Sequence, residues 1–184
     1  GFLFVALMCC LIGAVGMVSI KAITERSDGL YNNQVQGMRL MSDILTRFQL
    51  IRVKLRDVVL ANDPVAIEAK INDIKVATDT ALMDLEQFKK LQADKHDSDL
   101  FAAFMEARAG YVKVRDSIVN LGRRNDDKVA WAYIQGTAVP PVAVYGATIQ
   151  SMLNYMVDKA RKSYEESREL ESRATLAMGI LLVV

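Results

Sequence analysis

Residues 41–63, MSDILTRFQLIRVKLRDVVLAND, carry an apolar repeat that a single charge interrupts. Alternating steps of three and four residues meet Met38, Met41, Leu45, Phe48, Arg52, Leu55 and Val59. This spacing is typical of a helix that packs along one face in a coiled coil or a helical bundle. The repeat therefore predicts a long core helix with the guanidinium of Arg52 in the middle of its packing face.

The 184-residue chain starts and ends with uncharged apolar segments. Residues 2–20 hold no charged side chain, and a helix of about 20 residues can cross roughly 30 Å of hydrocarbon. Residues 174–184 are also uncharged. We therefore expect a transmembrane helix over residues 1–20, a polar domain over residues 21–173, and the start of a second transmembrane helix over residues 174–184. A cleaved signal peptide is the alternative for the first segment, but it would leave the second unexplained.

The composition of the polar domain excludes several classes of protein. The chain has 23 Lys and Arg against 22 Asp and Glu, a net charge of +1, so a strongly basic nucleic-acid binder is not expected. Both cysteines, Cys9 and Cys10, lie in the first apolar segment, which leaves the polar domain without a disulfide framework or thiolate metal site. The only histidine, His96, has no ligand-spaced partner, and the sequence holds no glycine-rich phosphate loop or nucleophile set. We expect no catalysis, no cofactor and no metal.

Helix-breaking residues divide the polar domain into long helical stretches. The first should run from the membrane through Lys21 to about Ala61. Asp63 can cap a second helix that has Pro64 in its first position and ends near Ala93.

The third stretch lies between the turn DKHDSD and a glycine. Ser98 or Asp99 should cap this helix, and Gly122 should end it as a C-terminal glycine. Apolar side chains at helical spacing give the packing faces of the second and third helices. These are Ile67, Ile71, Ile74, Thr78, Ala81, Leu85 and Phe88 in the second, and Leu100, Phe104, Ala107, Tyr111, Val114, Ile118 and Leu121 in the third.

The fourth stretch opens at Asn125 or Asp126 and is interrupted at GTAVPP, residues 136–141. The two prolines remove backbone donors, so the helix must break, kink or restart there. The pattern then resumes through Tyr145, Ile149, Met152 and Met156 and reaches the second apolar segment without a breaker. The sequence therefore predicts an all-α fold, an up-down-up-down four-helix bundle continuous with two transmembrane helices.

Arg52 raises the question of what faces it, because a buried guanidinium without a partner costs several kcal/mol. A rise of 1.5 Å per residue puts Arg52 roughly 14 Å and Thr78 roughly 20 Å below the distal turn. On the third helix, Tyr111 and Arg108 lie roughly 17 and 21 Å below Gly122 by the same rise. Three helices therefore place polar residues of their packing faces at nearly one level, which predicts a pocket.

Two further positions complete the candidate site. Arg56 lies one turn from Arg52 on the same helix face, and Tyr145 could close the pocket from the fourth helix. Two guanidinium forks together with hydroxyl groups suit a small di- or tricarboxylate, because bidentate pairing favours planar anionic groups. The candidate ligand-binding residues are Arg52, Arg56, Thr78, Arg108, Tyr111 and Tyr145.

A purely structural interpretation of the same residues stays open. Arg52 could form an ion pair across a dimer or with Asp84 or Asp116, and Arg108 could be a solvated residue beside Arg115. The threonine hydroxyl could bond its own helix backbone, and the two tyrosines could be ordinary core residues.

Two segments carry a resemblance to a known family. They are IRVKLRDVVLAND at residues 51–63, and the pattern of Ala130, Ala132, Pro140, Pro141 and Tyr145 in the fourth stretch. With its two bracketing helices, the chain resembles the extracytoplasmic four-helix-bundle sensor domain of bacterial methyl-accepting chemotaxis receptors. The resemblance covers essentially the whole chain, and it leaves the output module open, since similar bundles sit on histidine kinases and cyclases.

The resemblance implies a homodimer in the bacterial inner membrane with residues 21–173 in the periplasm. It also implies that helix 1 arginines and polar groups of neighbouring helices receive an organic acid such as malate, succinate or citrate, or an amino acid such as aspartate. Signalling to control chemotaxis would then pass through the fourth helix by a piston-like displacement. The alternatives are the input domain of a sensor histidine kinase and a non-sensing structural bundle that serves dimerisation.

Overall fold

A computed structural model of the protein describes residues 13–14, 16–18, 20–22, 24, 34–92 and 95–183, with side chains omitted at 177, 178 and 180–183. The long helices are α2 (Gln36–Leu60), α3 (Pro64–Lys89), α4 (Lys95–Arg123), α5 (Asp127–Gln135) and α6 (Val139–Val183). Within these described ranges the regular secondary structure is entirely helical, which confirms the predicted all-α class.

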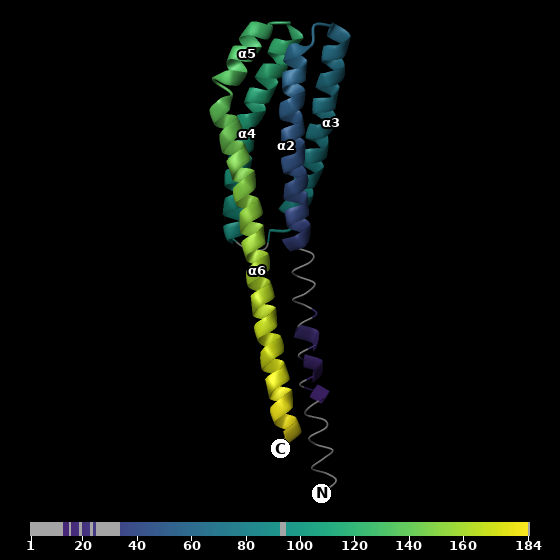
Figure 1. Ribbon diagram of the computed structural model, residues 1–184, viewed down its shortest axis with the longest axis vertical. Helices are drawn as coiled ribbons and strands as arrows, with labels where there is room; N and C mark the ends of the chain where they lie inside the picture. The colour runs from purple at the N-terminus through teal and green to yellow at the C-terminus, as the bar shows by residue number, and fades with distance from the viewer. Residues whose placement is uncertain are drawn as a thin grey trace. The chain divides into compact units, whose positions relative to one another are not determined.

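Residues Gly37–Tyr155 form one compact unit, and it holds α2 to α5 with the first part of α6. In this unit the α2–α3 and α4–α5 turns lie at one end, and the last residues of α3 and the first residues of α4 lie at the other (Figure 1). α5 and the first part of α6 together make the fourth arm. The predicted up-down-up-down order of a four-helix bundle is therefore confirmed.

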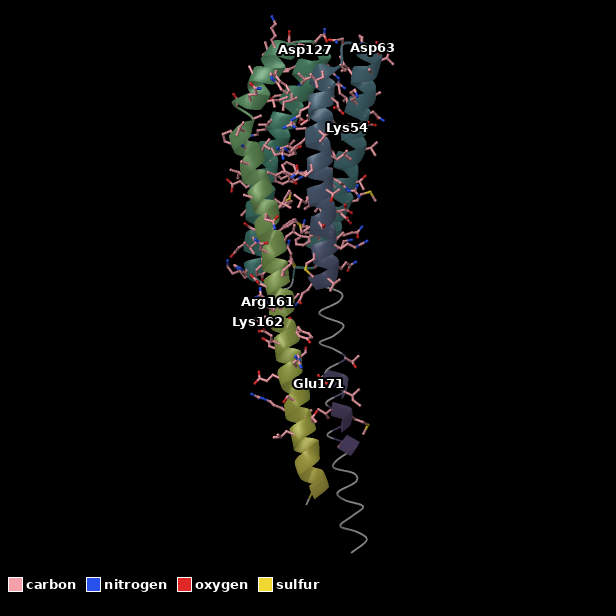
Figure 2. The ribbon with its side chains drawn as sticks, in the orientation of Figure 1. Lys54, Asp63, Asp127, Arg161, Lys162 and Glu171 are labelled. Atoms are coloured by element: carbon pink, nitrogen blue, oxygen red, sulfur yellow. The ribbon has the colours of Figure 1, made fainter. Side chains whose placement is uncertain are left out.

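The turn between α2 and α3 forms as its residues predict. The Asp63 carboxylate accepts a hydrogen bond from the Ala66 backbone N–H at 2.9 Å, and Pro64 opens the helix. Proline costs nothing at this position because the first N–H groups of a helix have no partner within it. Figure 2 labels Asp63 at the same end of the bundle as Asp127, the first residue of α5.

The start of α4 differs from the prediction. The helix begins at Lys95, before the expected caps Ser98 and Asp99, so residues read as a turn are helical. Asp97 in the first turn is buried, and its Oδ1 accepts a hydrogen bond from the Tyr155 hydroxyl at 2.7 Å. A tertiary partner and the positive end of the helix both favour this carboxylate, which explains why the helix starts early.

The end of α4 also corrects a prediction, because Gly122 does not terminate the helix. The left-handed residue is Asn125, with φ of 58°. Its N–H donates to the Gly122 carbonyl at 3.0 Å, and the Asp126 N–H donates to the Leu121 carbonyl at 3.2 Å. These two bonds form a Schellman motif. Gly122 itself is buried, and a Cβ there would lie closer than 3.0 Å to Val58 Cγ1, so this glycine permits the close approach of α2 and α4.

The predicted break in the fourth stretch is confirmed. α5 has Asp126 as its N-cap residue and ends at Gln135, and a new helix, α6, begins at Val139. Pro140 and Pro141 therefore lie in the first turn of α6, where a missing N–H leaves no bond unmade. The Val142 N–H donates to the Ala138 carbonyl at 3.2 Å, which starts the new helix just before the prolines.

The predicted packing faces of α3, α4 and α6 are largely confirmed. The buried members of those predicted sets are Ile67, Ile74, Leu85, Phe88, Phe104, Tyr111, Val114, Ile118, Tyr145, Ile149, Met152 and Met156.

Met41, Phe48, Leu55 and Val59 are buried, so most of the predicted packing face of α2 is confirmed, but the face also takes in residues beside the predicted positions. Ile44, Ile51 and Val58 are buried, while Leu45 and Arg52 are half-buried at the flank. The prediction that Arg52 lies in the middle of the core face is therefore wrong. The physical reason is that two apolar repeats overlap in this stretch, and the one through Ile51 buries an aliphatic side chain in place of a charge.

The membrane prediction falls largely outside the described residues, since much of 1–20 is not included. Among the residues that are described, no helix is both long enough and apolar enough to cross a membrane. α6 continues without interruption to Val183 and so includes residues 174–183. The boundaries of the predicted membrane segments stay a prediction.

Candidate functional site

Three aromatic rings from three helices meet in the middle of the bundle. Phe48 on α2 makes edge contacts with Tyr111 on α4 and Tyr145 on α6, with ring centroids 5.1 and 5.0 Å apart. The rings of Tyr111 and Tyr145 stack at 5.0 Å with an interplanar angle of 15°. All three side chains are buried. This aromatic cluster joins α2, α4 and α6 at one level.

A groove of about 460 Å³ lies beside the aromatic cluster, between α2 and the α5–α6 arm. Phe48, Tyr111 and Ile118 are among its most buried lining residues. Its polar lining residues are Gln49, Arg52, Arg56, Tyr111 and Gln150. Gly146 also lines the groove, and a Cβ on it would lie 3.3 Å from the edge of the Phe48 ring, so a larger residue would crowd that ring.

Arg52 lies at the edge of this groove and is half-buried. Its Nη1 donates to Gln49 Oε1 at 2.8 Å, and its Cζ lies 5.5 Å from the centroid of the Phe48 ring. Both contacts hold the guanidinium without neutralising its charge, because the amide is uncharged and the ring offers only its quadrupole.

The carboxylates that the sequence suggested as partners of Arg52 are paired elsewhere. Asp84 Oδ2 accepts from Arg47 Nε at 3.0 Å, and Asp116 Oδ1 lies 2.7 Å from Arg115 Nη2. An ion pair of Arg52 with either carboxylate of its own bundle is therefore wrong.

Arg56 lines the same groove one turn along α2 and is exposed. Within the described part of the chain, neither Arg52 nor Arg56 forms an ion pair. The groove thus carries two guanidinium groups on one wall with no acidic side chain among its lining residues.

Tyr111 is a predicted site residue that lines the groove and also belongs to the aromatic cluster. It is 3% exposed, and its hydroxyl is buried without a hydrogen-bond partner among the described residues. Burial raises the pKa of this hydroxyl well above its usual value, against the opposing influence of Arg115 and Arg52. The group is therefore a neutral donor at physiological pH. A buried polar group without a partner costs free energy, so this hydroxyl would gain from an acceptor.

A second, much smaller cavity of about 20 Å³ is lined by residues of α2, α3, α4 and α6. It is lined by Thr78, Arg108, Arg115, Tyr111 and Tyr145 together with apolar residues. Such a volume has room for about one water-sized molecule and not for an organic acid.

Hydrogen bonds inside this small cavity account for one of the predicted polar residues. Thr78 Oγ1 donates to the Ile74 carbonyl at 2.8 Å and accepts from Arg115 Nη1 at 3.1 Å. Tyr145 is 5% exposed, and burial raises its pKa to about 12, against the influence of Arg108 and Arg115.

The structure therefore divides the six predicted residues between two cavities. Arg52, Arg56 and Tyr111 line the groove, and Thr78, Arg108, Tyr111 and Tyr145 line the smaller cavity. The predicted coincidence of levels is present, but one pocket does not contain all six side chains.

Sequence reasoning missed four residues that shape these cavities. They are Gln49, Arg115, Gln150 and Phe48, the last of which was assigned only to packing. Arg115 follows the predicted residue Tyr111 by four positions, so helical spacing from Tyr111 could have indicated it.

Comparison with curated proteins gave no match. A protein-family model described as a four helix bundle sensory module for signal transduction matches residues 1–170. This match covers most of the chain and agrees with the helix order and bundle architecture described above. The chain therefore belongs to the family of four-helix-bundle sensory modules of methyl-accepting chemotaxis proteins.

Proposed function

We propose that this chain is the ligand-sensing part of a transmembrane chemoreceptor and that it binds a small organic acid in the groove beside the aromatic cluster. The observation that carries the proposal is that Arg52, Arg56 and Tyr111, whose hydroxyl has no hydrogen-bond partner among the described residues, all line one groove of about 460 Å³. Pockets for small molecules are commonly about 300 to 1,000 Å³, so this volume suits such a ligand.

The chemistry of the groove favours an anion. A guanidinium offers a planar pair of donors that matches a carboxylate, and neither Arg52 nor Arg56 pairs with an acidic side chain among the described residues. The sequence hypothesis names a di- or tricarboxylate such as malate, succinate or citrate, with aspartate as the alternative. The mechanism is binding without catalysis.

Signalling would follow from the position of α6. This helix lines the groove with Val142, Gly146 and Gln150 and continues to Val183. A ligand shifts a conformational equilibrium only by its different affinity for the two states, and a groove between α2 and α6 gives it that leverage. The proposal includes a homodimer in the bacterial inner membrane, with residues 21–173 in the periplasm and residues 1–20 and 174–184 in membrane helices.

The test is calorimetry on the 184-residue chain in lipid nanodiscs, because detergent monomers could occupy an apolar groove. A panel of small mono-, di- and tricarboxylates and amino acids is titrated into the wild-type chain and into Arg52→Ala and Arg56→Ala. Loss of one charge-assisted contact should weaken binding by about 10- to 100-fold. The matched control is Arg39→Ala, an exposed arginine on α2 outside the groove, which should bind as the wild type does.

A panel without any bound acid would refute the proposal, as would binding that neither arginine substitution changes. The signalling step has its own measurement. With Cys9 and Cys10 replaced by serine, spin labels at the exposed Leu50 and Ser151 should report a changed α2–α6 distance when a binding acid is added. An unchanged distance at saturation would overturn the mechanism through α6.

A further inference from the structure

The two walls of the groove differ in chemistry. Arg52, Arg56 and Gln49 all come from α2, so the positive charge lies on one side. The opposite wall comes from α5 and α6, and its lining residues there are apolar apart from Gln150. They include Ile134, Ala138, Val139, Val142, Ala143 and Ala147.

This asymmetry restricts the ligand. One carboxylate can lie between Arg52 and Arg56, which are one helical turn apart. A second carboxylate on the far side of a di- or tricarboxylate would face aliphatic side chains and lose water without gaining a cation. An apolar ligand body would instead gain from contact with Val142, Ala143 and Ala147.

Tyr111, which lines both this groove and the smaller cavity, adds a second observation. The Tyr111 hydroxyl is a buried donor without a partner among the described residues. The Tyr111 ring contacts the Phe48 ring, and the Arg52 guanidinium lies over that Phe48 ring. A carboxylate oxygen that also reached this hydroxyl would satisfy it. Alanines at 143 and 147 on the α6 wall leave the groove open to a compact ring or branched chain.

We infer that the groove takes an aromatic or branched aliphatic monocarboxylate, with its carboxylate between Arg52 and Arg56 and its apolar body against the α6 wall. This inference rests on the proposed function, which assigns the groove as the sensor site, and it narrows the class of organic acid.

The test compares benzoate and cyclohexanecarboxylate with succinate, malate and citrate by calorimetry on the 184-residue chain in nanodiscs. Benzoate should bind at least about tenfold more tightly than succinate, and uncharged benzamide should bind at least about tenfold more weakly than benzoate. Ala147→Leu fills the apolar side of the groove and should weaken benzoate binding by about tenfold or more. The matched control is Ala109→Leu, at an exposed α4 position outside the groove, and it should leave binding unchanged.

Tyr111→Phe keeps the ring and removes only the hydroxyl, so it tests the site if Ala147→Leu fails to fold. We expect a loss of about tenfold in benzoate affinity, the usual scale for one hydrogen bond to a charged group. Tighter binding of succinate or citrate than of benzoate, lost on Arg52→Ala, would overturn this inference and leave the proposed function standing. No binding of any acid would overturn both. Benzoate binding that neither Arg52→Ala nor Tyr111→Phe alters would place it outside the groove and overturn the inference.

Discussion

Replacing Gly122 with alanine should destabilise the bundle, although alanine is the better helix former. In an exposed helix interior, glycine to alanine gains at most about 1 kcal/mol. At Gly122 the new Cβ would lie closer than 3.0 Å to Cγ1 of Val58, whereas carbon atoms pack best at about 3.5 to 4.0 Å. Val58 is fully buried and β-branched, so it has little freedom to move away.

Such overpacking costs about 1 to 3 kcal/mol, so the expected net loss is about 1 kcal/mol after the gain in propensity. For a chain of this size that loss lowers the melting temperature by about 2 to 4 °C. Gly110 on the same helix is the matched control, because a Cβ there meets no atom within 4 Å. Gly110→Ala should stabilise the bundle by about 0.5 to 1 kcal/mol.

The assay is thermal unfolding followed by far-ultraviolet circular dichroism, with all variants in the same non-ionic detergent. Opposite signs for the two glycine substitutions are the expected result. Combining Gly122→Ala with Val58→Ala should cost less than the sum of the single changes, because the smaller side chain removes the overlap. The reasoning would be refuted if Gly122→Ala stabilised the bundle as much as Gly110→Ala.

Three further outcomes follow from the described contacts. Asp63→Ala removes the cap of α3 and should lower stability by about 1 kcal/mol in thermal unfolding, while Asp79→Ala on the same helix should be nearly neutral. Thr78→Val removes the acceptor of Arg115 and should cost about 1 kcal/mol, and a neutral result would show that this hydrogen bond is not stabilising. Burial raises the pKa of Tyr145 from 10.0 to about 12. The contribution of neutral Tyr145 to the free energy of unfolding is therefore fully present below pH 10 and should be lost as pH rises from about 10 to 12. Tyrosinate absorbance should show this late titration beside that of Tyr111, and Tyr145→Phe should remove one of the two late-titrating groups. Titration of Tyr145 together with the exposed tyrosines would contradict its buried packing.

The sequence by itself determined the helix order, because the signals involved are local. Asp63 and Pro64 start α3 within a single turn, because the Asp63 side chain accepts a backbone N–H and proline needs no partner for its nitrogen there. Pro140 and Pro141 likewise lie in the first turn of a new helix, α6. The apolar faces of α3, α4 and α6 follow from helical spacing, and all four predicted positions on α6 and four of seven on each of α3 and α4 are buried.

Tertiary structure decided what local signals left degenerate. In α2 two apolar repeats overlap, and only packing against the other helices chose Ile51 over Arg52 for the core. At the end of α4, Gly122 was predicted to end the helix. It instead allows α4 to approach Val58 of α2, which is far away in sequence. The six candidate residues share a level because rise per residue is fixed, yet they are divided between two cavities because the aromatic cluster stands between them. The sequence determines how far along a helix each residue lies, whereas packing against neighbouring helices determines which face of the helix is buried.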